Sequence, residues 1–487
     1  MENVYQKYQA VIGLEVHAQL STNSKAYCGD AVEYGALPNT QISAISLGHP
    51  GTLPKTNKKV VEFAVKLGLA LNCKIRRENE YARKNYFYAD LPKGYQITQD
   101  KTPICYEGYL DIKDDKGNDK RIRITRIHME EDAGKSMHDQ SPEHTFIDLN
   151  RVGVPLLEIV TEPDIRTSTE AYNYLTEIRK IVRYIEVCDG NMEEGSMRCD
   201  ANVSVMLKDA KEFGNRCEVK NMNSIRNVQR AIDFEIKRQI DEIENGGYIS
   251  QDTRSFDANN GTTFLLRSKE QANDYRYFPE PDLQPVLIEE SYVNEIKKNL
   301  PPLPQQLAKK YIHQLGLSAY DANVITENKA MALYFEELLN HTKNLKAAAN
   351  WLMGQIKSVL NEEAIEIENF KIKATSIAEL INFIDTGKIS HNIAAQKIFP
   401  EMLKNPELKP QEIAEKNAWV VDNNQDNLIE FINEAIAKYP EKVAEYKAGK
   451  KGLLGLFMGE VMKLSKGKAD PKVTTVLLTE ILEKNQL

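Results

Sequence analysis

The stretch VIGLEVHAQL, residues 11–20, alternates apolar and polar side chains and sets the pattern for the first part of the chain. Because successive side chains of a strand point to opposite faces of a sheet, the apolar residues at positions 12 to 18 share one face. Glu15, His17 and Gln19 share the other. A carboxylate and an imidazole on one strand face are suited to half of a divalent-metal site. A solvated polar face on an edge strand would have the same pattern.

Further strand-like runs follow, and glycine, proline and asparagine separate them. They are RIRITRIHM (121–129), VPLLEIV (154–160), MRCDANVSVML (197–207) and TTFLLR (262–267). Helical patterns are expected at 169–186 and 225–244, and Asn245-Gly246-Gly247 is a typical stop for the second. Residues 1–294 are therefore predicted to form an α+β domain with a mostly antiparallel sheet.

The pattern changes after a group of prolines between positions 279 and 304. Beyond it the spacing is helical, with a weaker break at 404–410 and helices expected at 427–439 and 472–484. The sequence thus predicts three domains: 1–294, an all-α domain at 295–409, and a small all-α tail at 410–487.

Composition limits the classes of function. The net charge is −8, so any RNA binding should be confined to local basic patches, and DNA is not an expected partner. The apolar runs are too short to span a bilayer, and no signal pattern opens the sequence. Six cysteines without a CxxC pair indicate a reducing compartment, and we expect a cytoplasmic protein.

Acidic residues mark two of the strands as candidates for chemistry. Glu158 interrupts an apolar run, and a buried carboxylate must be paired or bound to metal, so an arginine partner and a metal are equally good explanations. Glu130, Glu131 and Asp132 could hold Mg²⁺ or form a charged turn.

Two later strands mix acids with cations. Arg198 and Asp200 share a face, as do Arg216, Glu218 and Lys220. Such faces suit a metal–nucleotide site, in which acids hold the metal and cations neutralise phosphate oxygens. Cross-strand ion pairs would look the same. The number of these faces, more than any one of them, favours ATP-dependent phosphoryl transfer.

Possible substrate surfaces lie elsewhere. Residues 83–96 combine cations with four aromatic residues, as stacking on an unpaired RNA end requires, although core aromatics beside a turn would fit too. Residues 274–282 mix acids, arginine and aromatics. Lysines cluster at 447–451 and 463–468, where they could contact phosphates or form a solvated face. The sequence has no GxSxG, GxGxxG or P-loop motif.

Seven motifs occur in the order of one known family. They are IGLEVHAQL, RKNYFYADLPKGYQITQ, RIHMEEDAGKS, DLNRVGVPLLEIVTEPDI, EEGSMRCDANVSV, EVKNMNSIRNVQRAI and DYRYFPEPDLQP. The series resembles the B-type subunit of the tRNA-dependent aspartyl/glutamyl-tRNA amidotransferase (the GatB family), and the likeness extends to the last residue of the chain. The motif at 274–285 is followed by no synthetase-like insertion, which matches the B type and not the archaeal E type.

The resemblance implies a front cradle domain related to glutamine synthetase, and a tRNA-binding, YqeY-like tail. It implies ATP and Mg²⁺ as cofactors, with the metal ligands at Glu15, His17, Glu130 and Glu158. Asp200 and Glu218 match further acidic positions of the same cavity, and Arg198 and Lys220 are candidates for phosphate binding. It also implies partners in a heterotrimer: an ammonia-producing (A-type) amidase subunit, a small (C-type) subunit, and misacylated tRNA.

One departure from the family concerns zinc. Many relatives carry CxC followed by CPxC, whereas this chain has Cys28-Gly-Asp30 and Ser43-Ala-Ile-Ser46. A lone thiolate cannot hold structural zinc, so we expect none.

The expected activity is ATP-dependent phosphorylation, then amidation, of the side-chain carboxylate of Glu-tRNA(Gln) or Asp-tRNA(Asn), which makes the chain part of a carbon–nitrogen ligase. Two alternatives remain at this point: a stand-alone ligase of the glutamine synthetase type, and a non-catalytic tRNA-binding adaptor.

Overall fold

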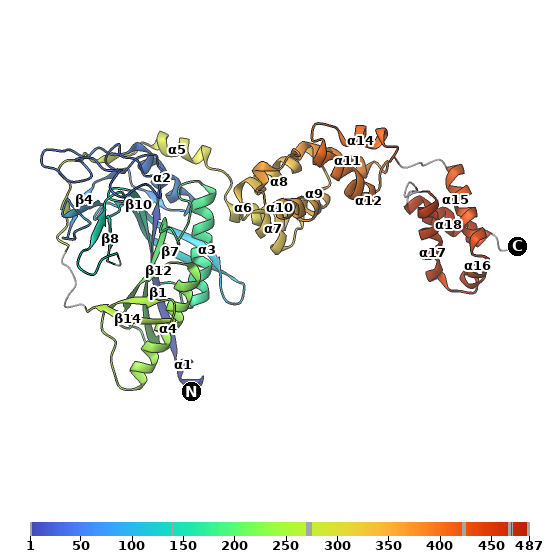
Figure 1. Ribbon diagram of the computed structural model, residues 1–487. Helices are drawn as coiled ribbons and strands as arrows, with labels where there is room; N and C mark the ends of the chain where they lie inside the picture. The colour runs from blue at the N-terminus through green and yellow to red at the C-terminus, as the bar shows by residue number, and fades with distance from the viewer. Residues whose placement is uncertain are drawn as a thin grey trace. The chain divides into compact units, whose positions relative to one another are not determined.

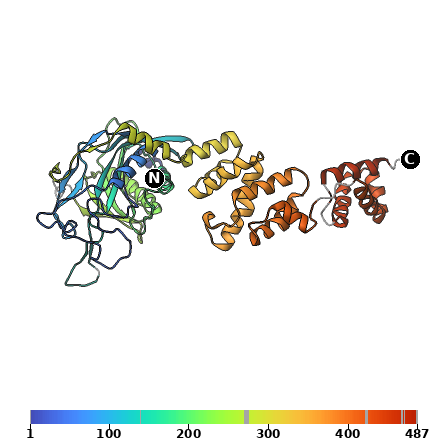
Figure 2. The same ribbon diagram turned by 90° about the horizontal axis from the view of Figure 1, so that it is seen from above.

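The computed structural model describes residues 2–138, 140–268, 275–420, 425–465, 469 and 471–484. The chain divides into two compact units, Met1–Leu303 and Pro304–Leu487. Every strand of the described residues lies in the first unit, and the second is helical (Figures 1 and 2). The predicted mixed α/β front part and helical back part are confirmed, while the three-domain division stays a prediction.

A nine-stranded sheet organises the first unit, in the order β14-β13-β12-β11-β1-β10-β7-β6-β2. All neighbouring pairs are antiparallel except β12 with β13. The strands are β1 (Tyr8–Gln19), β2 (Lys74–Ile75), β6 (Cys105–Lys113), β7 (Asp119–Glu131), β10 (Pro155–Thr161), β11 (Met197–Leu207), β12 (Cys217–Met222), β13 (Thr253–Asp257) and β14 (Thr262–Arg267).

Smaller sheets and helices complete this unit. The short strands are β3 (Glu78–Asn79), β4 (Ala82–Asn85), β5 (Tyr95–Thr98), β8 (Lys135–Met137), β9 (Phe146–Asp148), β15 (Phe278–Pro279) and β16 (Val286–Leu287), and β15-β4-β5 form a three-stranded sheet. The helices are α1 (Glu2–Tyr5), α2 (Lys58–Ala70), α3 (Ser168–Tyr184), α4 (Ile225–Glu244) and α5 (Glu290–Asn299).

Capping fixes the ends of the two long helices near their predicted positions. Thr167 accepts a hydrogen bond from the Glu170 amide at the start of α3, and Ser224 accepts one from the Asn227 amide at the start of α4. Helix α4 ends at the predicted asparagine–glycine stop, where Gly246 has φ +82°, a conformation that favours glycine.

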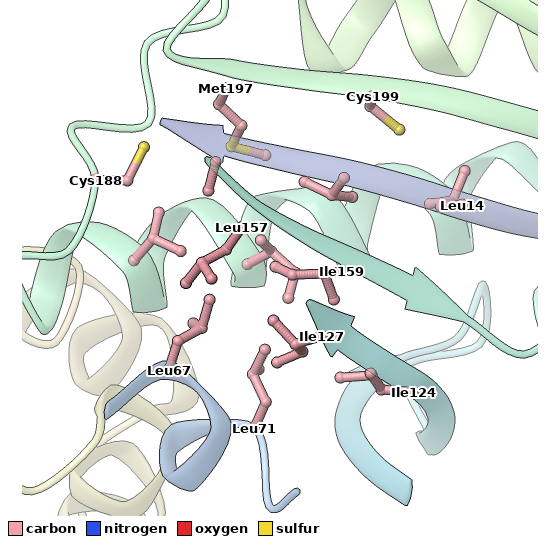
Figure 3. Close-up of a cluster of buried hydrophobic side chains, with 14 of the residues drawn as sticks. Leu14, Leu67, Leu71, Ile124, Ile127, Leu157, Ile159, Cys188, Met197 and Cys199 are labelled. Carbon is pink, nitrogen blue, oxygen red and sulfur yellow. The ribbon is translucent and has the colours of Figure 1, made fainter. Parts of the chain in front are cut away.

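The core lies on the apolar face of the sheet, as the period of two predicts. Leu14 of β1 and Leu157 and Ile159 of β10 are buried there. Figure 3 shows these side chains on the side of the sheet that faces Leu67 of α2 and the following Leu71. Because this face is closed by helices, the polar side chains of the same strands are left on the opposite face.

The second unit contains α6 (Pro304–Leu315) through α18 (Pro471–Lys484). Between them lie α7 (Ala319–Ile325), α8 (Lys329–His341), α9 (Leu345–Trp351), α10 (Lys357–Glu363), α11 (Ala374–Asp385), α12 (His391–Ile393), α13 (Phe399–Lys404), α14 (Pro410–Lys416), α15 (Gln425–Lys438), α16 (Pro440–Lys447) and α17 (Leu454–Leu464). Helices α15 to α18 share a core that includes Leu428, Phe457 and Leu478. In the described parts of the chain, no helix has the length and apolarity needed to cross a bilayer.

Candidate active site

The five central strands carry a continuous row of polar residues on the face opposite the core. His17 of β1 stands opposite Arg198 of β11 on one side and Glu158 of β10 on the other. Glu158 in turn stands opposite His128 of β7. Residues far apart in sequence are therefore neighbours, because antiparallel pairing aligns them across four strands.

Two histidines and two glutamates form a first cluster in this row. His17 Nε2 lies 3.2 Å from a Glu130 oxygen and 3.4 Å from a Glu158 oxygen. His128 Nε2 lies 3.1 Å from Glu158 and 3.7 Å from Glu130. The partners of Glu158 are thus imidazoles, and the arginine that one sequence interpretation offered is not among them.

The charges in this cluster stabilise one another. Burial lowers the pKa of His128, but Glu158 and Glu130 outweigh it and raise the value to about 9. The pKa of His17 is likewise raised against burial by hydrogen bonds to the same glutamates. Burial raises the pKa of Glu158, but the two histidines hold it well below its usual range. Two protonated imidazoles thus neutralise two carboxylates.

A second cluster lies beside the first and contains Glu15, Asp200 and Glu218. Glu15 accepts a hydrogen bond of 2.9 Å from Asn202 Nδ2. Lys220 Nζ contacts Asp200 and lies 2.7 Å from Glu218. Burial and the nearby charge of Glu158 raise the pKa of Glu15, because Lys220 forms its ion pairs with the other two acids and only partly offsets these effects.

Each cluster could hold a divalent cation. His17, Glu130 and Glu158 can bring one ligand atom each to within 4.8 Å of one another, and so can Glu15, Asp200 and Glu218. The four residues predicted as one ligand set are therefore divided by the structure. Glu15 lies with the acids of β11 and β12, and the other three lie together.

The three adjacent acids Glu130, Glu131 and Asp132, at the end of β7 and just after it, have separate partners, so they do not form a single metal site. Glu130 belongs to the first cluster. Glu131 points to the other face, contacts Lys93, and accepts a hydrogen bond of 2.9 Å from the Ile97 amide. Asp132 lies 2.9 Å from Arg198 and 3.4 Å from Arg151.

A cavity of about 1110 Å³ lies over both clusters. Its walls include Glu15, His17, Glu158, Arg198, Asp200, Glu218 and Lys220 among the predicted residues. Arg216, grouped with Glu218 and Lys220 by sequence, instead lines a smaller hollow of about 280 Å³ beside Gly13 and Phe213.

Sequence reasoning missed several residues of this cavity. His128 is the clearest example of a missed residue. The sequence could have indicated it, because His128 lies two residues before Glu130 and therefore on the same face of the strand. Lys84 and a wall of tyrosines were not assigned to this site, although they belong to the segments predicted as substrate surfaces. The ring centroids of Tyr86 and Tyr275 are 5.8 Å apart, and those of Tyr275 and Tyr277 are 6.4 Å apart. The tyrosines come from the two segments predicted as substrate surfaces, 83–96 and 274–282; Asp274 lies outside the described residues.

The lysine clusters of the tail are partly engaged in ion pairs. Lys450 lies 3.0 Å from Glu445, and Lys451 lies 3.0 Å from Glu483. Lys466 and Lys468 of the second cluster lie outside the described residues.

The four positions considered above for zinc, Cys28, Asp30, Ser43 and Ser46, lie together and are linked by hydrogen bonds. The Ser43 hydroxyl donates to Asp30 over 2.9 Å, and the Ser46 hydroxyl also donates to Asp30. Cys28 Sγ is 3.5 Å from Ser46 Oγ, and the buried Lys25 ammonium donates to the same hydroxyl over 3.3 Å. The hydroxyl and thiol hydrogen bonds outweigh burial and lower the pKa of Asp30.

Comparisons with known proteins place the chain in a family. The family model described as the GatB/GatE catalytic domain matches residues 10–294, and the one described as the GatB domain matches residues 333–482. Proteins named as the B-type subunit of aspartyl/glutamyl-tRNA(Asn/Gln) amidotransferase from Caldicellulosiruptor bescii and Thermodesulfovibrio yellowstonii are each 49% identical to this chain over 98% of its length and 100% of theirs. That of Persephonella marina is 47% identical over the same shares.

The match to the catalytic-domain model covers more than half of this chain, and the relatives align with it over nearly its whole length. The chain therefore belongs to the GatB/GatE family.

Proposed function

We propose that the chain activates the side-chain carboxylate of Glu-tRNA(Gln) or Asp-tRNA(Asn) with ATP and converts it to the amide. The support is a combination. The full-length relatives are named as one subunit of an amidotransferase for these tRNAs, and the polar sheet face forms the floor of a cavity large enough for a nucleotide and an aminoacyl end. The cradle-like relation to glutamine synthetase fits this chemistry.

The reaction has two bond exchanges. A carboxylate oxygen of the aminoacyl group attacks the terminal phosphorus of ATP, the bond to ADP breaks, and an acyl phosphate forms. Ammonia then attacks the carbonyl carbon, a proton leaves the nitrogen, and inorganic phosphate departs with the bonding electrons. Each step concentrates negative charge on phosphate oxygens, so the site must supply positive charge.

The predicted ligands Glu15, His17, Glu130 and Glu158 are proposed to hold Mg²⁺, with Asp200 and Glu218 beside them. Buried carboxylate oxygens with a neutral imidazole fit the donor preferences of divalent cations. The metal, when bound, would neutralise charge between these acids and the phosphates. Arg198 and Lys220 already contact carboxylates, so their main role is to orient these acids. Arg198 orients Asp132, and Lys220 orients the acids of the second cluster.

Ammonia must come from a partner. We propose a heterotrimer in which an A-type amidase subunit supplies it and a small C-type subunit joins the pair, while the helical parts, 295–409 and 410–487, hold tRNA. The relatives are named as one subunit of an enzyme, which supports an assembly. Charged tRNA as a substrate is consistent with a reaction in the cytoplasm.

We further propose that residues 28–46 bind no zinc. The positions that would be thiolates are Asp30, Ser43 and Ser46, whose oxygens are committed to hydrogen bonds with one another. One thiol and one carboxylate with two hydroxyls are a poor donor set for structural zinc, which is held by four cysteine or histidine ligands.

The deciding experiment adds the purified complex to Glu-tRNA(Gln) and Asp-tRNA(Asn) with ATP, with and without glutamine. Phosphorylated aminoacyl-tRNA should form when ammonia is withheld and should disappear when glutamine is added. Amidation of free glutamate without tRNA would favour the stand-alone ligase. Full amidation by a Glu15→Gln variant would favour the adaptor.

A further inference from the structure

The cations that line the cavity differ in what they already contact. Arg198 is 2.9 Å from Asp132, and Lys220 contacts both Asp200 and Glu218. The charges of both cations are therefore largely offset by neighbouring carboxylates, although Arg198 Nε is buried without a hydrogen-bond partner among the described residues. The group that meets the phosphoryl oxygens should therefore be another cation on the same walls.

Lys84 of β4 fits that description. Its side chain is partly buried and lines the cavity. The ammonium lies 4.8 Å from the centroid of the Tyr275 ring, a cation–π contact, and it has no ion pair or hydrogen bond with any residue that the structure describes. The aromatic contact restricts the ammonium without using its N–H donors.

The surroundings keep this ammonium charged. Burial lowers the pKa of Lys84, but the charges of Glu130 and Glu158 outweigh it and hold the pKa above its ordinary value. A partly buried ammonium that has no acceptor in the protein has lost part of its hydration, and an anionic ligand in the cavity would offset that cost.

The other cations on these walls are less suitable. Arg126 is exposed, and Arg267 donates to the Thr253 hydroxyl over 3.4 Å. Arg126 lacks the burial of Lys84. Arg267 is partly buried but already has hydrogen-bond partners in Thr253 and Tyr275, whereas the Lys84 ammonium has none among the described residues. The acids of both clusters would repel phosphate unless a cation stood between.

We propose that Lys84 binds the phosphoryl group that passes from ATP to the substrate carboxylate, and that Tyr275 holds its ammonium in place. The proposal rests on the function proposed above. While the carboxylate oxygen bonds to phosphorus and the bond to ADP breaks, Lys84 donates hydrogen bonds to the moving oxygens. The proton stays on the ammonium throughout.

The test compares Lys84→Met and Lys84→Arg in the assembled enzyme with ATP and Glu-tRNA(Gln) in the absence of ammonia. Lys84→Met should slow formation of phosphorylated aminoacyl-tRNA by about 100-fold, the usual effect of removing one donor to developing charge. Lys84→Arg should recover part of the rate, and tRNA affinity should stay unchanged in both. Lys74→Met, which removes an exposed lysine paired with Glu107, is the matched control.

Three results would overturn the assignment. They are an unchanged rate of phosphorylation in Lys84→Met, a loss confined to the later attack by ammonia, and a loss of tRNA binding. If Lys84→Met does not fold, the wild-type complex is labelled with an amine-reactive reagent, and ATP should protect Lys84 but not Lys74. Equal labelling with and without ATP would also reject it. An inactive wild-type complex would count against the proposed function, since the variants would then have no rate to change.

Discussion

The Nε2 atom of His128 lies 3.1 Å from a carboxylate oxygen of Glu158, across the pairing of β7 with β10. Both side chains are buried, and His17 approaches the same carboxylate from β1. A buried charge persists only when it is compensated, and here two imidazoles compensate two glutamates. A cation that enters the cluster must displace at least one proton, so ligand binding and protonation are linked at this site.

Replacing Glu158 with Gln should abolish phosphoryl transfer and leave tRNA binding intact. The substitution keeps the shape of the side chain but removes one of the two negative charges that stabilise the protonated histidines. The same charge is proposed to bind the metal. We expect formation of phosphorylated aminoacyl-tRNA to fall by more than about 100-fold, measured in single turnover. Glu62→Gln, a partly exposed change on α2, is the control. A wild-type rate in Glu158→Gln would mean that the polar residues on this face of the sheet are only structural.

Replacing His128 with Gln should weaken metal binding more than it weakens the fold. A glutamine side chain carries no charge to balance Glu158, and it differs from histidine in length and shape. The Glu158 carboxylate would therefore be less well oriented. The magnesium concentration for half-maximal activity should rise about 10- to 100-fold, as is usual when a partner of a metal ligand is removed. Titration of bound Mn²⁺ by electron paramagnetic resonance gives a second measure. An unchanged metal requirement with a lower rate at saturation would assign His128 a different role.

Strand faces could be predicted here because a period of two needs only local sequence. Ile12 and Leu14 are buried and Glu15 and His17 line the cavity, as the alternation of VIGLEVHAQL predicts. The ends of α4 were predictable for a similar reason, since Ser224 and Gly246 act on the nearest turn.

Pairing across strands was not predictable in the same way. His17 meets Glu158 because β1 and β10 align in one register, and no feature of either strand alone fixes that register. Hence the family-based ligand set did not reveal that Glu15 lies with Asp200 and Glu218. For Lys220 the sequence left phosphate binding and cross-strand ion pairing open, and the placement of Asp200 and Glu218 beside it shows the ion pairs.

Removal of metal should leave residues 28–46 intact. A zinc-selective chelator, added with Mg²⁺ in excess, should not change the melting temperature, and metal analysis of the purified protein should find no zinc in stoichiometric amount. Asp30→Asn should lower the free energy of unfolding by about 1–3 kcal/mol, because Ser43 and Ser46 lose a charged acceptor. Cys28→Ser should cost less than about 1 kcal/mol. Zinc that is present in the wild type and lost in Cys28→Ser would contradict the assignment.

The stability of α4 should depend on pH through Glu235. This carboxylate is buried, lies 2.5 Å from Arg238 and accepts a hydrogen bond of 2.9 Å from the Thr263 hydroxyl. Burial raises its pKa, but these partners outweigh burial and lower it. A lowered pKa contributes stability that is fully present above the unfolded value near 4.5 and is lost as pH falls through the folded value.

Glu235→Gln should therefore lower the free energy of unfolding at pH 7 by about 3–5 kcal/mol, the range for a buried pair that loses one partner. Denaturant titrations at several pH values should show this difference shrinking as the pH falls below the unfolded value near 4.5. Glu242→Gln, exposed on the same helix, should show neither effect. A difference for Glu235→Gln that stayed constant down to about pH 3 would mean that lost packing, and not the charge, destabilises the helix.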